Sequence, residues 1–163
     1  YENENNYKAY LDLVKEIADD FEELDYIVIA VSTGGTITGV SSEIRKYFKD
    51  VKIVAVDVEG SVIFSDYGKN RKLSGIGASK KSEFIDSVAQ IDEVLIFSEE
   101  EVVEGCKELI LENAIFAGIS SGAVYCGVKH IKKHNQNENL KILMICPDRG
   151  SSYMELLNQT NIK

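Results

Sequence analysis

The pattern of hydrophobic and polar residues alternates along the chain between helical spacing and unbroken apolar runs. Apolar residues at three- and four-residue steps predict a helix over about residues 7–23. Residues 26–31 form an unbroken apolar run, typical of a strand buried on both faces of a parallel sheet. Helical spacing returns over residues 37–48, and residues 52–56 form a second strand-like run. This order predicts a right-handed βαβ unit.

The same alternation continues in the second half of the chain. Residues 93–97 are a third apolar run, and Ser98 with Glu101 three residues later predicts a capping box that begins a helix. A turn of small residues at 118–123 begins another helix, and residues 142–146 form a fourth apolar run. Each predicted strand is thus followed by a turn and a helical pattern.

Strands that alternate with helices predict one fold class for residues 1–163, a three-layer α/β domain with a mostly parallel sheet flanked by helices. The pattern loosens over residues 58–90, and segments of this length inside compact domains are usually functional or mobile. Ligands of parallel sheets bind beyond the carboxyl ends of the strands. We therefore expect the loops at 32–36 and 147–150 on one rim, within reach of the turn at 119–123.

The composition favours a small-molecule ligand over a macromolecular partner. The formal net charge of −9 argues against nucleic acid and against an anionic membrane surface, because both attract basic faces. No apolar stretch is long enough to span a bilayer, and the cytoplasm is the expected compartment. Cys106, Cys126 and Cys146 lie in apolar surroundings without metal-ligand spacing, so we expect three buried thiols and no metal site.

Residues 32–36, with the sequence Ser-Thr-Gly-Gly-Thr, lie between the first predicted strand and the next helix. Backbone around Gly34 and Gly35 can direct several N–H groups at one anion, and the helix dipole adds partial positive charge there. A tight turn whose glycines only permit close packing is an equally open interpretation. The loop lacks the Gly-Lys-Ser/Thr ending of a triphosphate site and the G-x-G-x-x-G spacing of a dinucleotide site, so a single phosphate fits best.

Two other segments contain residues of chemical interest. Residues 75–79 are small and either bring backbone close to a ligand or form a plain turn. Residues 129–134 are mostly basic and end a predicted helix, where a solvated face that matches the helix dipole is the favoured interpretation. The residues alone therefore indicate a phosphate site without an obvious acid, base or nucleophile.

Three motifs in this order resemble one enzyme family. Residues 32–39 resemble the G-T-G-G-T-x-x-G phosphate loop of the cysteine synthase and cystathionine β-synthase family, the β-family (fold type II) pyridoxal-phosphate enzymes. Residues 73–77 are similar to that family's G-I-G stretch beside the substrate, and residues 118–123 match its G-I-S-S-G-A turn. The resemblance covers residues 26–154 but only the C-terminal half of the family's enzymes.

The resemblance implies pyridoxal 5′-phosphate as the cofactor. It implies that the cofactor's phosphate is bound by five loop residues, Ser32, Thr33, Gly34, Gly35 and Thr36. It also implies that the Ser120 hydroxyl bonds to the pyridine nitrogen. A serine there leaves the ring largely unprotonated, which suits elimination across Cα–Cβ better than transamination. The family reaction is β-replacement on a serine derivative, and the family's enzymes are typically homodimers.

One branch of the family is the closest in its short motifs. Ser32 stands where the family commonly has glycine, and residues 56–64, 75–79 and 147–150 accompany it. This combination resembles the N-(2-amino-2-carboxyethyl)-L-glutamate synthases of 2,3-diaminopropionate biosynthesis, which join O-phospho-L-serine to L-glutamate in siderophore pathways. The resemblance then implies five substrate-binding residues, Tyr1, Ser32, Gly75, Ile76 and Gly77. A cysteine synthase that uses O-acetylserine or O-phosphoserine with sulfide is the alternative within the family.

No stretch of the sequence resembles the family's Schiff-base lysine or its S/T-S-G-N substrate loop, which both belong to the N-terminal half. The sequence begins at Tyr1 rather than at methionine, so we expect a fragment without catalytic residues of its own. Such a fragment is expected to bind pyridoxal phosphate weakly and to catalyse little. A naturally separate half that binds a phosphorylated metabolite, or docks on a partner, is the alternative outside enzymes.

Overall fold

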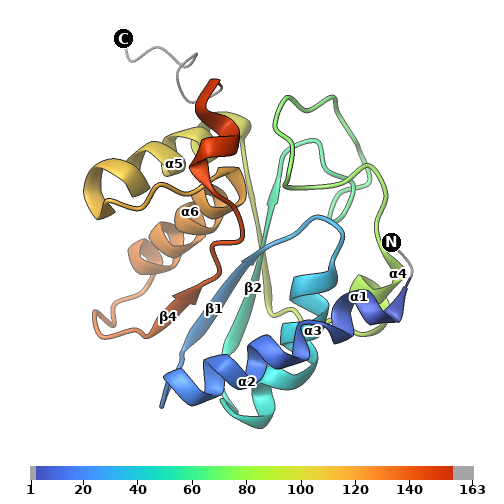
Figure 1. The fold of residues 1–163 in the computed structure, drawn as a ribbon, viewed down its shortest axis with the longest axis vertical. Helices are drawn as coiled ribbons and strands as arrows, with labels where there is room; N and C mark the ends of the chain where they lie inside the picture. Colours follow the sequence, from blue (N-terminus) through green and yellow to red (C-terminus); the bar gives the residue numbers. More distant parts are fainter. Residues whose placement is uncertain (1–2, 156–163) are drawn as a thin grey trace.

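A four-stranded sheet runs through the centre of the computed structural model, which describes residues 3–155 (Figure 1). Its strands are β1 (Tyr26–Ala30), β2 (Lys52–Val58), β3 (Glu93–Phe97) and β4 (Ile142–Met144). They are ordered β3-β2-β1-β4, and every neighbouring pair is parallel. Val28 of β1 lies opposite both Val54 and Met144. The parallel sheet predicted from the alternating pattern is confirmed.

Helices cover both faces of the sheet and complete three layers (Figure 1). One layer contains α1 (Glu4–Lys8), α2 (Leu11–Asp20), α3 (Gly35–Glu43) and α4 (Glu83–Ser87). The other contains α5 (Glu99–Asn113) and α6 (Ile119–His134). Two 3₁₀ turns complete the described elements, η1 (Ile44–Lys46) and η2 (Gly150–Tyr153). The predicted fold class is therefore confirmed.

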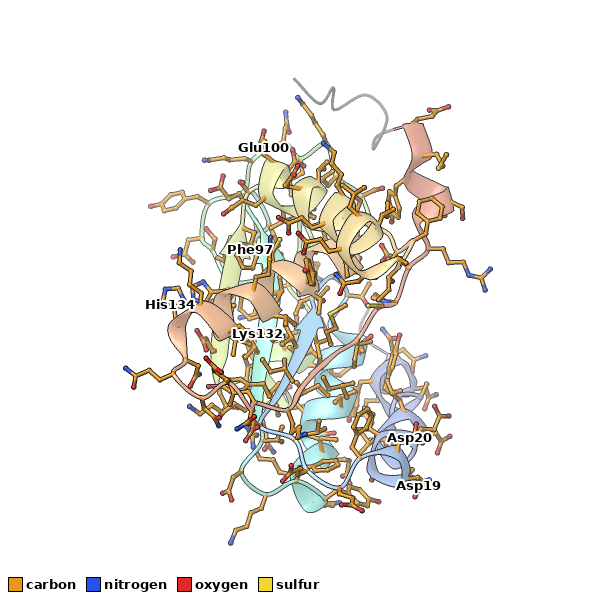
Figure 2. All side chains as sticks on the ribbon, turned by 90° about the vertical axis from the view of Figure 1, so that its left-hand side faces the viewer. Asp19, Asp20, Phe97, Glu100, Lys132 and His134 are labelled. Atoms are coloured by element: carbon orange, nitrogen blue, oxygen red, sulfur yellow. The ribbon has the colours of Figure 1, made fainter. Side chains whose placement is uncertain are left out.

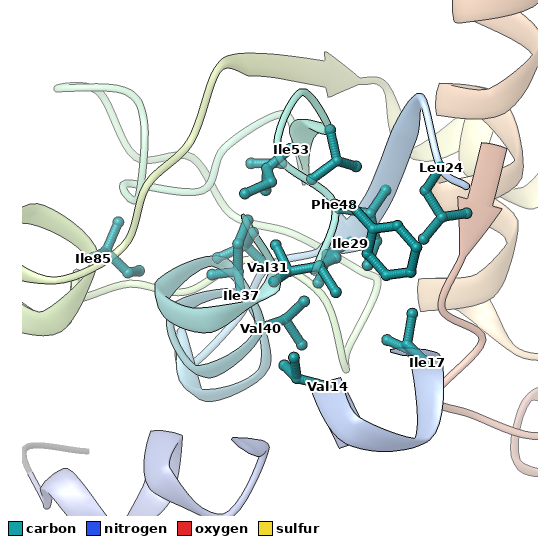
Figure 3. Close-up of a cluster of buried hydrophobic side chains, with 14 of the residues drawn as sticks. Val14, Ile17, Leu24, Ile29, Val31, Ile37, Val40, Phe48, Ile53 and Ile85 are labelled. Carbon is teal, nitrogen blue, oxygen red and sulfur yellow. The ribbon is translucent and has the colours of Figure 1, made fainter. Parts of the chain in front are cut away.

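Two hydrophobic clusters, one on each face of the sheet, explain the unbroken apolar runs. Successive side chains of a strand point to opposite faces, so Ile27 and Ile29 pack with the α3 layer whereas Val28 packs with the α6 layer. Figure 3 shows the first cluster, with side chains that include Val14, Ile17, Ile29, Val31, Ile37, Val40 and Phe48. Both faces of β1 are therefore buried in hydrophobic contacts, and only the ends of the strand are available to a ligand.

The helix predicted over residues 7–23 is wrong in one respect, because the structure divides it into α1 and α2 around Ala9 and Tyr10. The neighbouring helix α3 approaches closely here. A Cβ atom added at Gly39 would lie 2.8 Å from the Tyr10 Cβ and would also meet the Tyr7 carbonyl oxygen. A tertiary contact accompanies the interruption, and neither glycine nor proline occurs at the break.

The remaining element boundaries differ from the prediction by a few residues. The predicted helix at 37–48 ends as α-helix at Glu43 and continues as η1. Strand β2 extends to Val58, and β4 ends at Met144 rather than residue 146. Strand β4 is an edge strand paired only with β1, and just beyond its end the Ile145 N–H still donates to the Val28 carbonyl (3.2 Å).

Residues 58–90 form a long loop that contains α4 and folds back on the carboxyl ends of β1 and β2. The Val62 N–H donates to the Ala78 carbonyl (2.9 Å), and the Ala78 N–H donates to the Ser61 hydroxyl (3.1 Å). The Gly77 N–H donates to the Val31 carbonyl (2.8 Å). These bonds fix the loop against the end of the sheet where ligands of parallel sheets bind.

The prediction of three buried thiols holds for Cys106 and Cys126 but is wrong for Cys146, which is exposed. The physical reason is that Cys146 follows the end of the edge strand β4 and so lies outside the sheet. Burial raises the pKa of Cys106 to about 12 and that of Cys126 to about 11. Both buried thiols therefore stay protonated at neutral pH and are poor nucleophiles.

The basic segment at residues 129–134 forms the end of α6, where Figure 2 shows Lys132 and His134. Both of these side chains are exposed, as is Lys133. The Lys129 ammonium group pairs with Glu108 of α5. Cations at a helix C-terminus match the helix dipole, so the predicted solvated, dipole-matching face is confirmed.

None of the helices within residues 3–155 is long and apolar enough to cross a membrane. The same part of the chain contains no group of three or more His, Cys, Asp or Glu side chains that could bind a metal ion.

Candidate functional site

The loop at 32–36 connects β1 to α3 and leaves the N-terminus of that helix without a cap. Gly34 precedes α3 in a left-handed conformation (φ +88°), and no side chain of the described residues hydrogen-bonds to cap this end. The first turn of α3 also contains no acidic residue. The first N–H groups of a helix have no intrahelical partner and form the positive end of the dipole. The loop therefore presents an anion-attracting helix end.

The two central glycines of the loop are also required by packing. A Cβ atom at Gly34 would lie 2.7 Å from Cγ1 of Ile85, which belongs to α4. A Cβ atom at Gly35 would lie 2.7 Å from the side-chain oxygen of Asn6 in α1. The positive φ of Gly34 is a second reason for glycine at this position, because a residue with a Cβ atom is strained in that conformation. Close packing, one of the two interpretations of the sequence, is therefore observed, while binding of an anion by this loop stays a prediction.

Ser32 joins this loop to the glycine-rich segment at 75–79. Its hydroxyl donates to the Gly77 carbonyl (3.0 Å), and the carbonyl of the preceding residue, Val31, accepts the Gly77 N–H. Ile76 between the two glycines is buried. The structure therefore brings Ser32, Gly75, Ile76 and Gly77, predicted from the resemblance to contact substrate, to one end of the sheet. Tyr1, the fifth residue of that prediction, lies outside the described residues.

Ser120 reaches the same place from the first turn of α6. Its hydroxyl donates to the Gly75 carbonyl (3.0 Å), and its backbone N–H donates to Oδ2 of Asp148 (2.9 Å). The expectation that the turn at 119–123 reaches the rim of the sheet is confirmed. A hydroxyl has one hydrogen and two lone pairs, so Ser120 keeps acceptor capacity beyond its bond to Gly75.

Asp148 caps α6 and was not among the predicted site residues. Its Oδ1 accepts hydrogen bonds from the Ser121 N–H (3.1 Å) and the Ser121 hydroxyl (2.7 Å). Its backbone carbonyl accepts the Gly118 N–H (3.1 Å). In the sequence, Asp148 is only an acidic residue in the turn after the last predicted strand. Its partner in the helix, Ser120, lies 28 residues away.

Tyr153 of η2 lies next to Gly75, since a Cβ atom at Gly75 would be 2.6 Å from the tyrosine hydroxyl oxygen. Burial raises the pKa of Tyr153, and the negative charge of Asp148 and a hydrogen bond to it raise that pKa further. The hydroxyl is therefore a hydrogen-bond donor at neutral pH. A cavity of about 560 Å³ lies beside it, lined by Lys72, Ser74 and residues 151–155.

Three solved structures are similar to this chain over nearly its whole length. O-acetylserine sulfhydrylase isoform 3 from Entamoeba histolytica has a TM-score of 0.89 at 31% identity, covering 99% of this chain and 49% of that one. O-ureido-L-serine synthase has a TM-score of 0.90 at 26% identity, covering 100% and 52%. The O-acetylserine dependent cystathionine beta-synthase from Helicobacter pylori has a TM-score of 0.86 at 26% identity, covering 94% and 50%.

The chain thus spans about half the length of these structures, and its three-layer fold is the one found in that half. The family model described as "Pyridoxal-phosphate dependent enzyme" matches residues 1–148. Cofactor and fold predicted from the three short motifs agree with this match. The chain belongs to the pyridoxal-phosphate dependent enzyme family.

Proposed function

We propose that this chain is the cofactor-phosphate-binding domain of an enzyme that performs β-replacement on a serine derivative with pyridoxal 5′-phosphate. The observation that supports this most directly is the uncapped N-terminus of α3 behind Gly34. It is a site for a phosphate group at the rim where Ser32 and Ser120 also lie.

The residues at this rim fit the cofactor in charge and in shape. The loop of Ser32, Thr33, Gly34, Gly35 and Thr36 offers N–H groups and hydroxyls without a competing carboxylate. Ser120 can donate its hydroxyl hydrogen to the unprotonated pyridine nitrogen by turning that hydrogen away from the Gly75 carbonyl. The bound cofactor would supply the electron sink that labilises the substrate at Cα and Cβ.

The reaction we propose joins O-phospho-L-serine to L-glutamate and gives N-(2-amino-2-carboxyethyl)-L-glutamate as a siderophore precursor. Ser32 supports this choice, because its hydroxyl is tied to Gly77 where substrate and cofactor would meet. The Schiff-base lysine is expected outside this chain. Lys8 and Lys15 are surface residues paired with Glu4 and Asp12. A homodimer in the cytoplasm remains a prediction from the family resemblance.

The test is an assay of the protein at its native length with two substrate pairs. O-Phosphoserine with glutamate is expected to give the aminocarboxyethyl-glutamate product, detected by mass spectrometry, and O-acetylserine with sulfide is expected to give little cysteine. Product formed only with sulfide would refute the proposed acceptor. The 163-residue chain alone is expected not to turn over O-phosphoserine, and turnover by it would refute the assignment of the lysine to another segment.

A further inference from the structure

A second cavity lies on the long loop, next to the segment that Ser32 contacts. It has a volume of about 410 Å³ and is lined by Arg71, Gly77, Ala78, Ser79 and Lys80. Of these five residues, two have cationic side chains, one has a hydroxyl, and the glycine and alanine leave the space unfilled. Carboxylate side chains do not line it within residues 3–155. This lining favours an anionic group.

Arg71 is positioned by the protein but keeps most of its donors for a ligand. Its Nη1 donates to the Ile76 carbonyl (2.5 Å), and among the described residues this is the guanidinium's single hydrogen-bond acceptor. A guanidinium has five N–H donors in a fixed fork that matches a carboxylate. A side chain at residue 77 would clash with Nη1, so Gly77 gives the guanidinium its place.

The buried carboxylate of Asp57 is close enough to Arg71 for the two charges to interact. Asp57 is 1% exposed and its Oδ2 has no hydrogen-bond partner within the described residues, although Oδ1 accepts the Val58 N–H (2.8 Å). Burial raises the pKa of Asp57, whereas the Arg71 charge is among the factors that lower it.

The cavity and the candidate site share Gly77. The carbonyl of this residue accepts the Ser32 hydroxyl, while the residue itself lines the cavity. The rim and the cavity with its two cations therefore meet at Gly77. The acceptor amino acid L-glutamate has a side-chain carboxylate three bonds beyond Cα, which extends away from the reacting amine. The phosphate of O-phosphoserine is attached directly at the reacting Cβ and has no comparable reach.

We propose that Arg71 and Lys80 bind the side-chain carboxylate of an acidic acceptor amino acid. This rests on the proposed function and assigns residues to its acceptor, since sulfide would need no such subsite. The site selects a dicarboxylic amino acid over its neutral amide by charge and by the guanidinium fork.

The test compares three single variants of the native-length protein, Arg71→Gln, Lys80→Gln and the control Lys69→Gln. Glutamine at 71 removes the charge, and because its amide nitrogen is two bonds closer to Cα than Nη1 it also loses the bond to the Ile76 carbonyl. Lys69 is exposed in the same segment and does not line the cavity. Arg71→Gln is expected to raise the KM for L-glutamate about tenfold or more, and Lys80→Gln about threefold.

The KM for O-phosphoserine is expected to stay within about twofold in all three variants, and Lys69→Gln is expected to match the parent. An unchanged glutamate KM in Arg71→Gln, or an increase confined to the O-phosphoserine KM, would overturn the subsite while the proposed function stands. If no product forms from glutamate, the proposed function fails. Calorimetric titration with L-glutamate and L-glutamine then decides the subsite, because equal affinity for the two would overturn it.

Discussion

The turns that begin α3 and α6 are built from the same kinds of small residues. The free N–H groups at the two helix N-termini differ, because only those of α6 donate to a side chain of the described residues. No side chain among the described residues caps α3, and its first turn has no acidic residue. The N-terminus of α6 receives the Asp148 carboxylate, which accepts bonds from Ser120 and Ser121. A helix end attracts an exogenous anion only where the protein has not supplied one. This separates the proposed phosphate site at α3 from a serine that Asp148 fixes at α6.

The largest effect is expected from Gly34→Ala, which adds a side chain at φ +88° and 2.7 Å from Ile85. The left-handed conformation and the contact together are expected to lower the free energy of unfolding by about 2 kcal/mol. The affinity for pyridoxal phosphate is expected to fall as well. Urea unfolding measures the free energy of unfolding, and fluorescence titration measures the affinity for pyridoxal phosphate.

The double variant Gly34→Ala/Ile85→Ala is the control for that result. It removes the contact with Cγ1 but keeps the backbone conformation strained. The double variant is expected to stay less stable than Ile85→Ala alone. Equal stability of these two variants would show that the conformation of Gly34 does not matter.

The next effect is expected at Asp148, whose replacement by alanine leaves the Ser120 and Ser121 donors without their acceptor. We expect a loss of about 1–2 kcal/mol in unfolding free energy, as for other helix caps, and a smaller loss for Asp148→Asn. The comparison of the two turns also predicts that Asp148→Ala lets inorganic phosphate bind at α6. Amide shifts of residues 120 and 121 on titration with phosphate measure this, and an unresponsive α6 would contradict the comparison.

Local signals in the sequence were sufficient for most elements. Ser98 and Glu101 form the predicted capping box, with the Glu101 carboxylate accepting the Ser98 N–H (2.8 Å), because both partners lie within one turn. Strand β3 has the predicted boundaries. Both depend on residues close in the chain, where side-chain type and spacing determine the hydrogen bonds.

Contacts between distant segments account for the features that were missed. The break between α1 and α2 accompanies the approach of Gly39, and the Asp148 cap joins residues 28 positions apart. The Ser120 hydroxyl bonds to Gly75 across 45 positions, and its predicted contact with the pyridine nitrogen remains a prediction. No spacing rule within one segment reports such pairs. The short family motifs named the segments but not the bonds between them.

A smaller effect is expected from Ser32→Gly, which removes the bond to the Gly77 carbonyl. One hydrogen bond contributes about 1 kcal/mol, so we expect the KM for O-phosphoserine to rise by about fivefold at most. Cofactor affinity is expected to change less than the KM for O-phosphoserine, because the helix end and Gly34 remain. Ser32→Thr, which keeps a hydroxyl, is the matched control. Equal loss of cofactor and substrate affinity would contradict the assignment of Ser32 to the substrate.

The smallest effect on stability, and the most direct test of the comparison, is expected from Thr36→Asp. This change places an acid in the first turn of α3, which has none, and so gives α3 the carboxylate that α6 receives from Asp148. We expect a gain of about 0.3–1 kcal/mol in unfolding free energy together with weaker binding of pyridoxal phosphate. Thr36→Asn, nearly the same in shape and without charge, separates electrostatics from lost hydroxyl contacts. If Thr36→Asn weakens the binding of pyridoxal phosphate as much as Thr36→Asp does, then the partial positive charge at the N-terminus of α3 is not what attracts the phosphate.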